Sequence, residues 1–291
     1  MSEPIVFALP GNEAMATDLA ALLNGAVGES VIRRFPDGET FVKIVAPGSG
    51  RDVILVCTLD RPDEKLMPLY FACKTLREFG ATRITLVAPY LAYMRQDMRF
   101  NEGECITSVY FAEFISSFVD QLITVDPHLH RRESLSEIYK VPTLALHAAP
   151  LISAWIRDHV QNALLVGPDM ESAQWVSAVA KEAGAPFIVL EKKRHGDSDV
   201  EVLVPDVSEW KDHTPVLVDD IISTARTMIE TAGHLNKYGY KPAVCIGVHG
   251  IFANNAYAEL LGSGVGRVVT TNAIAHATNC ISVTGLIAGS L

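Results

Sequence analysis

The chain has 291 residues, of which 49% are hydrophobic, so it can bury the core of one large domain or two ordinary ones without cross-links. Its formal net charge of −10 argues against nucleic acid or an anionic membrane as a partner, because a negative surface is repelled by both. A small anion could still bind in a local basic pocket.

Short runs rich in Val, Ile and Leu alternate with helical patterns along the whole chain. In the first half the sequence predicts strands at 5–11, 51–59, 82–91 and 121–130 and helices at 12–25, 66–81 and 107–118. In the second half it predicts strands at 162–169, 186–194, 214–221, 242–250 and 267–273 and helices at 170–185, 224–239 and 254–262. Apolar strands that alternate with helices indicate an α/β fold with mainly parallel sheets.

The two halves also resemble each other, which suggests a duplicated α/β domain with a junction near residue 150. Residues 86–97 (LVAPYLAYMRQD) and 216–227 (VLVDDIISTART) both leave a strand through a polar loop. Residues 122–130 and 268–276 form a second possible pair. We therefore expect two domains of one kind, each a mainly parallel sheet flanked by helices.

The cysteines and the apolar runs bear on the compartment. Five cysteines lie far apart without a CxxC pair, which is typical of reduced thiols in a cytosolic protein. The opening residues lack the pattern of a signal peptide, and no run reaches the roughly 18 apolar residues of a membrane span. We expect a cytoplasmic protein without a membrane segment.

Polar segments stand where the predicted elements end. Ligands of open α/β sheets bind beyond the carboxyl ends of the strands, so several such exits in one chain predict a polar cleft. The segments are 36–39 (PDGE), 93–97 (YMRQD), 125–128 (VDPH), 167–169 (GPD), 191–194 (EKKR) and 219–227 (DDIISTART).

Residues 216–228 (VLVDDIISTARTM) have the chemistry of a ribose-phosphate site. Asp219 and Asp220 can accept hydrogen bonds from two vicinal sugar hydroxyls. Hydroxyl groups around a helix start, together with its free backbone N–H groups, attract a phosphate. The alternative is that Ser223 or Thr224 only caps the helix while the aspartates are solvated.

The same segment resembles the phosphoribosyl-diphosphate loop of the phosphoribosyltransferase superfamily. Other motifs narrow the resemblance to the ribose-phosphate diphosphokinase family, and together they cover nearly the whole chain in that family's order. These motifs are FPDGETFVKI (35–44), PYLAYMRQD (89–97), VDPHLH (125–130), GPDMES (167–172) and VLEKKR (189–194).

The resemblance implies two tandem phosphoribosyltransferase-like domains, at 1–150 with the ATP-binding elements and at 151–291 with the ribose 5-phosphate loop. It implies transfer of the β,γ-diphosphoryl group of MgATP to the C1 hydroxyl of ribose 5-phosphate, giving phosphoribosyl diphosphate (PRPP) and AMP. The chain has no GxxxxGK[ST] loop, so its ATP site must be of another type. A homodimer or higher homo-oligomer is expected.

The resemblance also assigns the site residue by residue. For ATP it implies Phe35, Asp37, Gly38, Glu39, Arg95, Gln96 and Asp97. For ribose 5-phosphate it implies Arg194, Asp219, Asp220, Ser223, Thr224, Ala225, Arg226 and Thr227. It makes Lys192 and Arg194 catalytic, and His128 and Asp169 ligands of a Mg²⁺ cofactor.

For two of these assignments, the residue types also allow a different role. Mg²⁺ prefers oxygen ligands, so Asp169 with substrate phosphates suits it better than His128, and HLH at 128–130 could suggest zinc if a third ligand were near. The basic run at 192–194 could be a solvated loop. In the family it closes over the triphosphate, where positive charge favours phosphoryl transfer.

The sequence departs from the family pattern at several positions. Arg226 stands where glycine is usual, Ser223 where aspartate is common, and Lys193 where arginine is usual, and 168–172 lacks a frequent glycine-containing run. Two alternative functions therefore stay open: a phosphoribosyltransferase that uses PRPP, and a weakly active regulatory paralogue.

Residues 98–107 (MRFNEGECIT) bear on regulation. Many family members carry an arginine-rich segment here, which contributes to an allosteric site where phosphate activates and ADP inhibits. This chain has only Arg99 there, against Glu102 and Glu104. We expect activity that is largely independent of phosphate, with ADP competing only at the ATP site.

Overall fold

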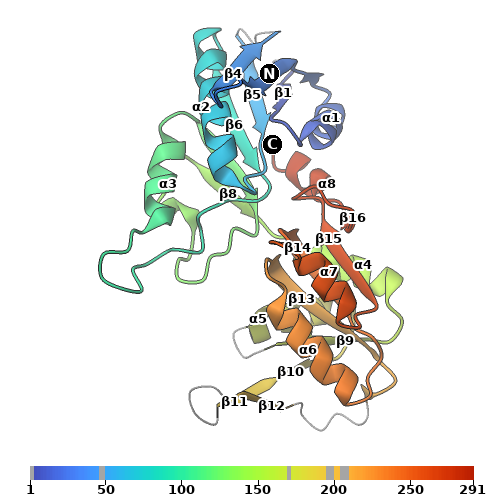
Figure 1. The fold of residues 1–291 in the computed structure, drawn as a ribbon. Coiled ribbons are helices and arrows are strands. Elements are labelled where there is room, and N and C mark those ends of the chain that lie inside the picture. The colour runs from blue at the N-terminus through green and yellow to red at the C-terminus, as the bar shows by residue number, and fades with distance from the viewer. Residues whose placement is uncertain (1–2, 46–49, 169–171, 195–199, 204–209) are drawn as a thin grey trace. The chain divides into compact units, whose positions relative to one another are not determined.

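The computed structural model describes residues 3–45, 50–168, 172–194, 200–203 and 210–291 (Figure 1). Contacts divide the chain into two compact units. Unit 1 comprises Met1–His147, Ala273–Ala275 and Val283–Leu291, and unit 2 comprises Ala148–Asn272 and His276–Ser282. Independent folding of domains at 1–150 and 151–291 stays a prediction.

Unit 1 is built on a sheet in which all strand pairs are parallel. Its described strands lie in the order β2-β1-β5-β6-β7-β8. The bounds are β1 Ile5–Ala8, β2 Ala26–Val27, β5 Asp52–Val56, β6 Arg83–Ala88, β7 Gln121–Val125 and β8 Thr143–Leu146. An antiparallel hairpin, β3 Ser30–Arg34 with β4 Thr40–Ile44, stands between β2 and β5 in the chain.

The helices of unit 1 follow from their own end signals and apolar faces. In α2, Pro62 opens the helix, Asp63 and Glu64 lie in its positive first turn, and Leu69, Cys73 and other buried side chains recur every three or four residues. The helix therefore begins at Pro62, four residues before the start predicted at residue 66. The helices are α1 Glu13–Leu22, α2 Pro62–Glu78, α3 Thr107–Ser116, the 3₁₀ turn η1 Leu135–Glu137, and α8 Thr284–Ala288.

Unit 2 repeats this plan. Its described parallel strands lie in the order β10-β9-β13-β14-β15-β16. They are β9 Ala163–Gly167, β10 Phe187–Val189, β13 Thr214–Ile222, β14 Val244–Gly250, β15 Arg267–Thr271 and β16 Asn279–Ile281. The antiparallel pair β11 Glu191–Arg194 and β12 Val200–Leu203 is inserted between β10 and β13, and the helices are α4 Ala149–His159, α5 Ala173–Ala183, α6 Arg226–Lys237 and α7 Ala256–Gly262.

The matching strand orders confirm the predicted α/β class and the resemblance of the two halves. The predicted match of 122–130 with 268–276 holds, because β7 and β15 occupy equivalent places in the two sheets. The match of 86–97 with 216–227 is wrong, because β13 is equivalent to β5 and not to β6. Polar segments follow several strands of each sheet, so such a segment does not show which strands of the two sheets are equivalent.

Three further differences from the predicted elements have local causes. The strand predicted at 186–194 is two strands, because the chain leaves the sheet after β10 and β11 pairs with β12 instead. The hairpin β3–β4 was not predicted, since only Ile44 of its strand residues is buried and the strands carry no long apolar run. The sequence patterns also do not predict β2, β8, β12, β16, α4, α8 or η1.

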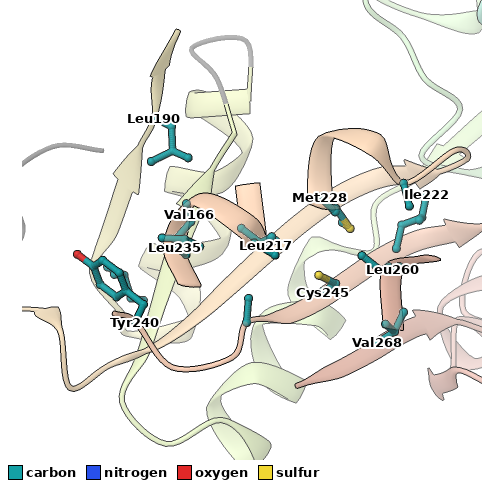
Figure 2. Packing of buried hydrophobic residues seen from close by; sticks show 14 of the residues in the cluster. Val166, Leu190, Leu217, Ile222, Met228, Leu235, Tyr240, Cys245, Leu260 and Val268 are labelled. Atoms are coloured by element: carbon teal, nitrogen blue, oxygen red, sulfur yellow. The ribbon is translucent and has the colours of Figure 1, made fainter. Parts of the chain in front are cut away.

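The core of unit 2 places its candidate binding loop. Side chains from β9, β13 and β14 pack beneath those of α6 and α7, with Leu217 on β13, Met228 and Leu235 on α6, and Cys245 on β14 (Figure 2). This packing fixes both the strand that ends at Ile222 and the helix that begins at Arg226. Among the described helices, none is long and apolar enough to cross a membrane.

Candidate active site

The loop between β13 and α6 presents two carboxylates and then a helix start. Asp219 and Asp220 are half-buried near the carboxyl end of β13, where the backbone N–H of Asp220 donates to Oδ1 of Asp219 at 2.9 Å. This bond holds the side chain of Asp219 near the strand end, and Asp220 is the next residue. This is the edge at which parallel sheets bind ligands.

The helix start offers backbone donors. Ala225 precedes α6 in the left-handed conformation (φ 57°), and no side chain caps the first turn of this helix. Capping by Ser223 or Thr224, the alternative function of these hydroxyls, is therefore not observed. The N–H groups of a first helical turn have no acceptor within the helix, so they can serve an anion.

Neighbouring strands hold this loop in place. The carbonyl of Ile222 accepts from the N–H groups of Ile251 and Phe252 at 3.1 and 3.0 Å, and that of Ser223 accepts from Ala253 at 3.0 Å. These bonds tie the loop after β13 to the loop after β14.

A small hollow opens beside the loop. Its lining includes Asp219 and the two threonines of α6, Thr227 and Thr231, with Pro168 from the end of β9. Thr227 thus lies near Asp219 in space, on the helix that follows the loop.

Other predicted residues of unit 2 are only partly described. Asp169 lies outside the described residues. The backbone of Lys192, Lys193 and Arg194 forms β11, paired with β12, but their side chains lie outside what the structure describes. Their placement in the site stays a prediction.

The hairpin of unit 1 displays an aromatic ring and carboxylates at its tip. Phe35 is 39% exposed, and the guanidinium of Arg33 lies 4.8 Å from the centre of its ring. Gly38 has a φ of 93°, which favours glycine, and the N–H of Glu39 donates to Asp37 Oδ1 at 3.2 Å. The predicted residues 35–39 therefore form one exposed turn.

The loop after β6 carries Arg95, Gln96 and Asp97. Arg95 is exposed, whereas the carboxylate side chain of Asp97 is only 6% exposed and is bound by Nη1 of Arg131 at 3.0 Å. The N–H of Ser108 donates to the carbonyl of Gln96 at 3.3 Å. Hydrogen bonds from Ser108 and Arg131 thus anchor residues 96 and 97 of this loop.

His128 follows β7 in a strained stretch. Asp126 and His128 both have positive φ, 37° and 54°, which is uncommon for residues other than glycine. The rings of His128 and His130 meet edge to face with centres 4.1 Å apart, and Oδ1 of Asp126 is 3.0 Å from Nδ1 of His147. The sequence prediction names His128, and Asp126 lies in the predicted polar segment 125–128, but it does not name His147 or Arg131, whose partners are distant in sequence.

Comparison with known proteins covers the chain from end to end. The model of the N-terminal domain of ribose phosphate pyrophosphokinase matches residues 4–118, and that of the phosphoribosyl transferase domain matches residues 134–283. A ribose-phosphate pyrophosphokinase from Methanothermobacter thermautotrophicus is 31% identical over 98% of both chains. The chain belongs to the ribose-phosphate pyrophosphokinase family.

A further relative agrees with this assignment, and a solved structure shows the same fold. The ribose-phosphate pyrophosphokinase of Methanopyrus kandleri is 32% identical over 96% of this chain and 95% of its own. In fold, the chain is similar to the crystal structure of phosphoribosylpyrophosphate synthetase from Mycobacterium smegmatis, with a TM-score of 0.86, 24% identity, and 99% and 97% of the two chains covered. Membership confirms the predicted fold class and ribose-phosphate pyrophosphokinase activity.

Proposed function

We propose that the chain transfers the diphosphoryl group of MgATP to the C1 hydroxyl of ribose 5-phosphate, giving PRPP and AMP. The observation that carries the proposal is the β13–α6 loop, in which Asp219 and Asp220 precede an uncapped helix start, in a chain whose whole length matches one family. The proposal needs a sugar-phosphate site, a nucleotide site and positive charge at the diphosphoryl group.

Ribose 5-phosphate would bind at this loop. Asp219 and Asp220 accept hydrogen bonds from the vicinal hydroxyls of the ribose. The phosphate lies on the N–H groups of the first turn of α6, with hydroxyl donors beside it. The residues proposed around the phosphate are Ser223, Thr224, Ala225, Arg226 and Thr227, with Arg194 from β11.

The equivalent loop of unit 1 supports this choice by contrast. Helix α2 also follows a left-handed residue, Arg61 (φ 54°), but its first residue is Pro62, which has no N–H to donate. Asp63 and Glu64 place negative charge in the same turn. The start of α2 therefore repels a phosphate. Of the two helix starts, we propose only that of α6 as the site of the sugar phosphate.

ATP would bind to elements of unit 1. The exposed ring of Phe35 offers a face for adenine, and the carboxylates of Asp37 and Glu39 offer acceptors for its amino group. Gly38 permits the turn that brings them together. Arg95, Gln96 and Asp97 are proposed along the rest of the nucleotide.

His128 and Asp169 would hold the Mg²⁺. The imidazole of His128 is half-buried at the carboxyl end of β7, and a set of one nitrogen and one carboxylate leaves room for the water and phosphate oxygens that Mg²⁺ prefers. When bound, the ion supplies charge neutralisation across the phosphates. Lys192 and Arg194 are proposed to add positive charge where negative charge develops in the transition state.

The proposal also covers the oligomeric state of the protein and its location in the cell. Met67 and Phe71 on α2 are 44% and 37% exposed, which favours a homodimer or higher oligomer, testable by light scattering after gel filtration. All five cysteines are free thiols, which supports a cytoplasmic location.

One assay separates the candidate functions. Purified protein is incubated with MgATP and ribose 5-phosphate, with and without each nucleobase, and AMP and PRPP are measured. Formation of both products without a base supports the proposal. Activity that needs PRPP and a base indicates a phosphoribosyltransferase instead, and no turnover under any condition indicates a regulatory paralogue.

A further inference from the structure

Asp97 in unit 1 is held by two arginines from a loop 34 residues further along the chain. Nη1 of Arg131 lies 3.0 and 3.3 Å from the two carboxylate oxygens of Asp97, and Nη2 of Arg132 donates to its carbonyl oxygen at 3.2 Å. Both the side chain and the backbone of one residue are therefore fixed by neighbouring arginines. We call Arg131 and Arg132 the arginine clamp.

The clamp is itself anchored to a rigid turn. Nη1 of Arg132 lies 3.7 Å from Oε2 of Glu137, the last residue of η1. Glu137 also accepts from the backbone N–H of Ser134 at 3.2 Å, and Ser134 caps the same turn, so the two residues form a capping box. Because the 3₁₀ turn holds Glu137, the position of Arg132 does not depend on a freely rotating partner.

Arg131 also contacts the residues that follow Asp97. Its guanidinium lies 5.3 Å from the centre of the ring of Phe100, which is 55% exposed. A cation over an aromatic face is attracted to it. One side chain thus joins residues 97 and 100 to the loop that carries His128.

We propose that the arginine clamp positions the 95–97 loop for the nucleotide, so that Arg131 and Arg132 set the affinity for ATP without touching it. This rests on the proposed function, in which Arg95, Gln96 and Asp97 lie at ATP. Arg131 is 52% exposed, yet the carboxylate it holds is 6% exposed, so removal of the arginine leaves a shielded charge without this partner. The 95–97 loop then loses the bond that fixes the side chain of Asp97.

The test compares Arg131→Ala and Arg131→Lys with wild type and with Arg157→Ala. Arg157 is a matched control, because it is an exposed arginine (57%) beside an exposed Asp158 at 3.9 Å, on α4 of unit 2. Arg131→Ala should raise KM for MgATP about tenfold and leave kcat and KM for ribose 5-phosphate near wild type. Arg131→Lys should recover part of the loss, since lysine keeps the charge but not the planar guanidinium that also lies over the ring of Phe100.

Calorimetric titration with AMP and MgATP, without ribose 5-phosphate, separates positioning from direct contact. A positioning role predicts an equal fold-loss of affinity for both nucleotides in Arg131→Ala. A loss confined to MgATP would overturn the proposal and make Arg131 a phosphate ligand. A fall in kcat with both KM values unchanged, or kinetics that match wild type, would also overturn it.

These outcomes distinguish failure of the clamp from failure of the proposed function. If wild type binds MgATP but forms no AMP with ribose 5-phosphate, the proposed function fails while the titrations still decide the clamp. If wild type turns over and Arg131→Ala keeps its nucleotide affinity, only the clamp fails. Thermal unfolding of each variant checks that the fold is intact.

Discussion

Gly247 on β14 makes room for Ile222 on β13. A Cβ atom on Gly247 would lie 2.6 Å from Cδ1 and Cγ1 of Ile222, far inside the normal contact distance. Ile222 is 1% exposed and is the last residue of the strand that carries Asp219 and Asp220. Because Gly247 has no side chain, Ile222 can pack against β14, and this packing positions the candidate ribose 5-phosphate loop that follows β13.

Gly247→Ala should destabilise the protein and disturb the loop together. Overpacking of a full core costs about 1–3 kcal/mol, and the displaced atoms belong to Ile222, so KM for ribose 5-phosphate should rise as well. Gly233→Ala is the control, because no atom lies within 4 Å of a Cβ at that position of α6 and alanine favours a helix by about 0.5–1 kcal/mol. Chemical denaturation and initial rates measure both; a Gly247→Ala protein with wild-type stability would contradict the packing argument.

The aspartate pair gives the next prediction. Changing Asp219 and Asp220 together to Asn should raise KM for ribose 5-phosphate or lower kcat/KM at least about tenfold, since a hydrogen bond to a charged group is worth about 1.5–3 kcal/mol. KM for MgATP should change little, which makes the second substrate an internal control. Unchanged kinetics in a folded variant would remove the aspartates from the sugar site.

Lys192 is expected to act on the transfer step. Lys192→Ala should lower kcat by about 100-fold or more, because loss of a group that stabilises transition-state charge has an effect of about that size. Lys193→Ala removes the same charge from the next residue and serves as control. Single-turnover rates at saturating substrates are the measurement; a normal rate with a raised KM would make Lys192 a binding residue.

The free thiols should divide into two reactive and three protected groups. Burial raises the pKa of Cys57 and of Cys245 to about 12 and also raises the pKa of Cys73, so these thiols stay protonated at neutral pH. Cys105 and Cys280 are exposed. A chromogenic disulfide reagent should titrate two thiols in the native protein and five after unfolding. Rapid labelling of a third native thiol would contradict the burial described for these side chains.

Sequence patterns predicted what is local and missed what is distant. The strand that carries Asp219 and Asp220 and the helix after it were predicted because an apolar run, a polar segment and a helical period follow one another. The hairpin carrying Phe35 was missed, since its half-buried strands have no long apolar run. No local rule could pair Asp97 with Arg131, because the chain reaches one from the other through α3 and β7.

The segment at 98–107 leads to the last prediction, on control by phosphate. The Glu104 carboxylate accepts from the side-chain amide of Asn101 at 2.7 Å and from the N–H groups of Phe100 and Asn101 at 2.9 and 3.1 Å. These bonds lower the pKa of Glu104, so the group stays ionised throughout the range of an assay. Three hydrogen-bond donors of this loop are therefore already bound to a carboxylate, and Nε of Arg99 donates to the carbonyl of Glu104 at 2.9 Å.

Inorganic phosphate would have to displace Glu104 and overcome its charge, so we expect initial velocity to be flat against phosphate at fixed free Mg²⁺ and ionic strength. ADP should inhibit only by competition with ATP. The measurement is velocity against phosphate, followed by ADP inhibition at several ATP concentrations. Strong activation of wild type by phosphate, or ADP inhibition that saturating ATP cannot relieve, would show that an effector site exists despite the occupied loop.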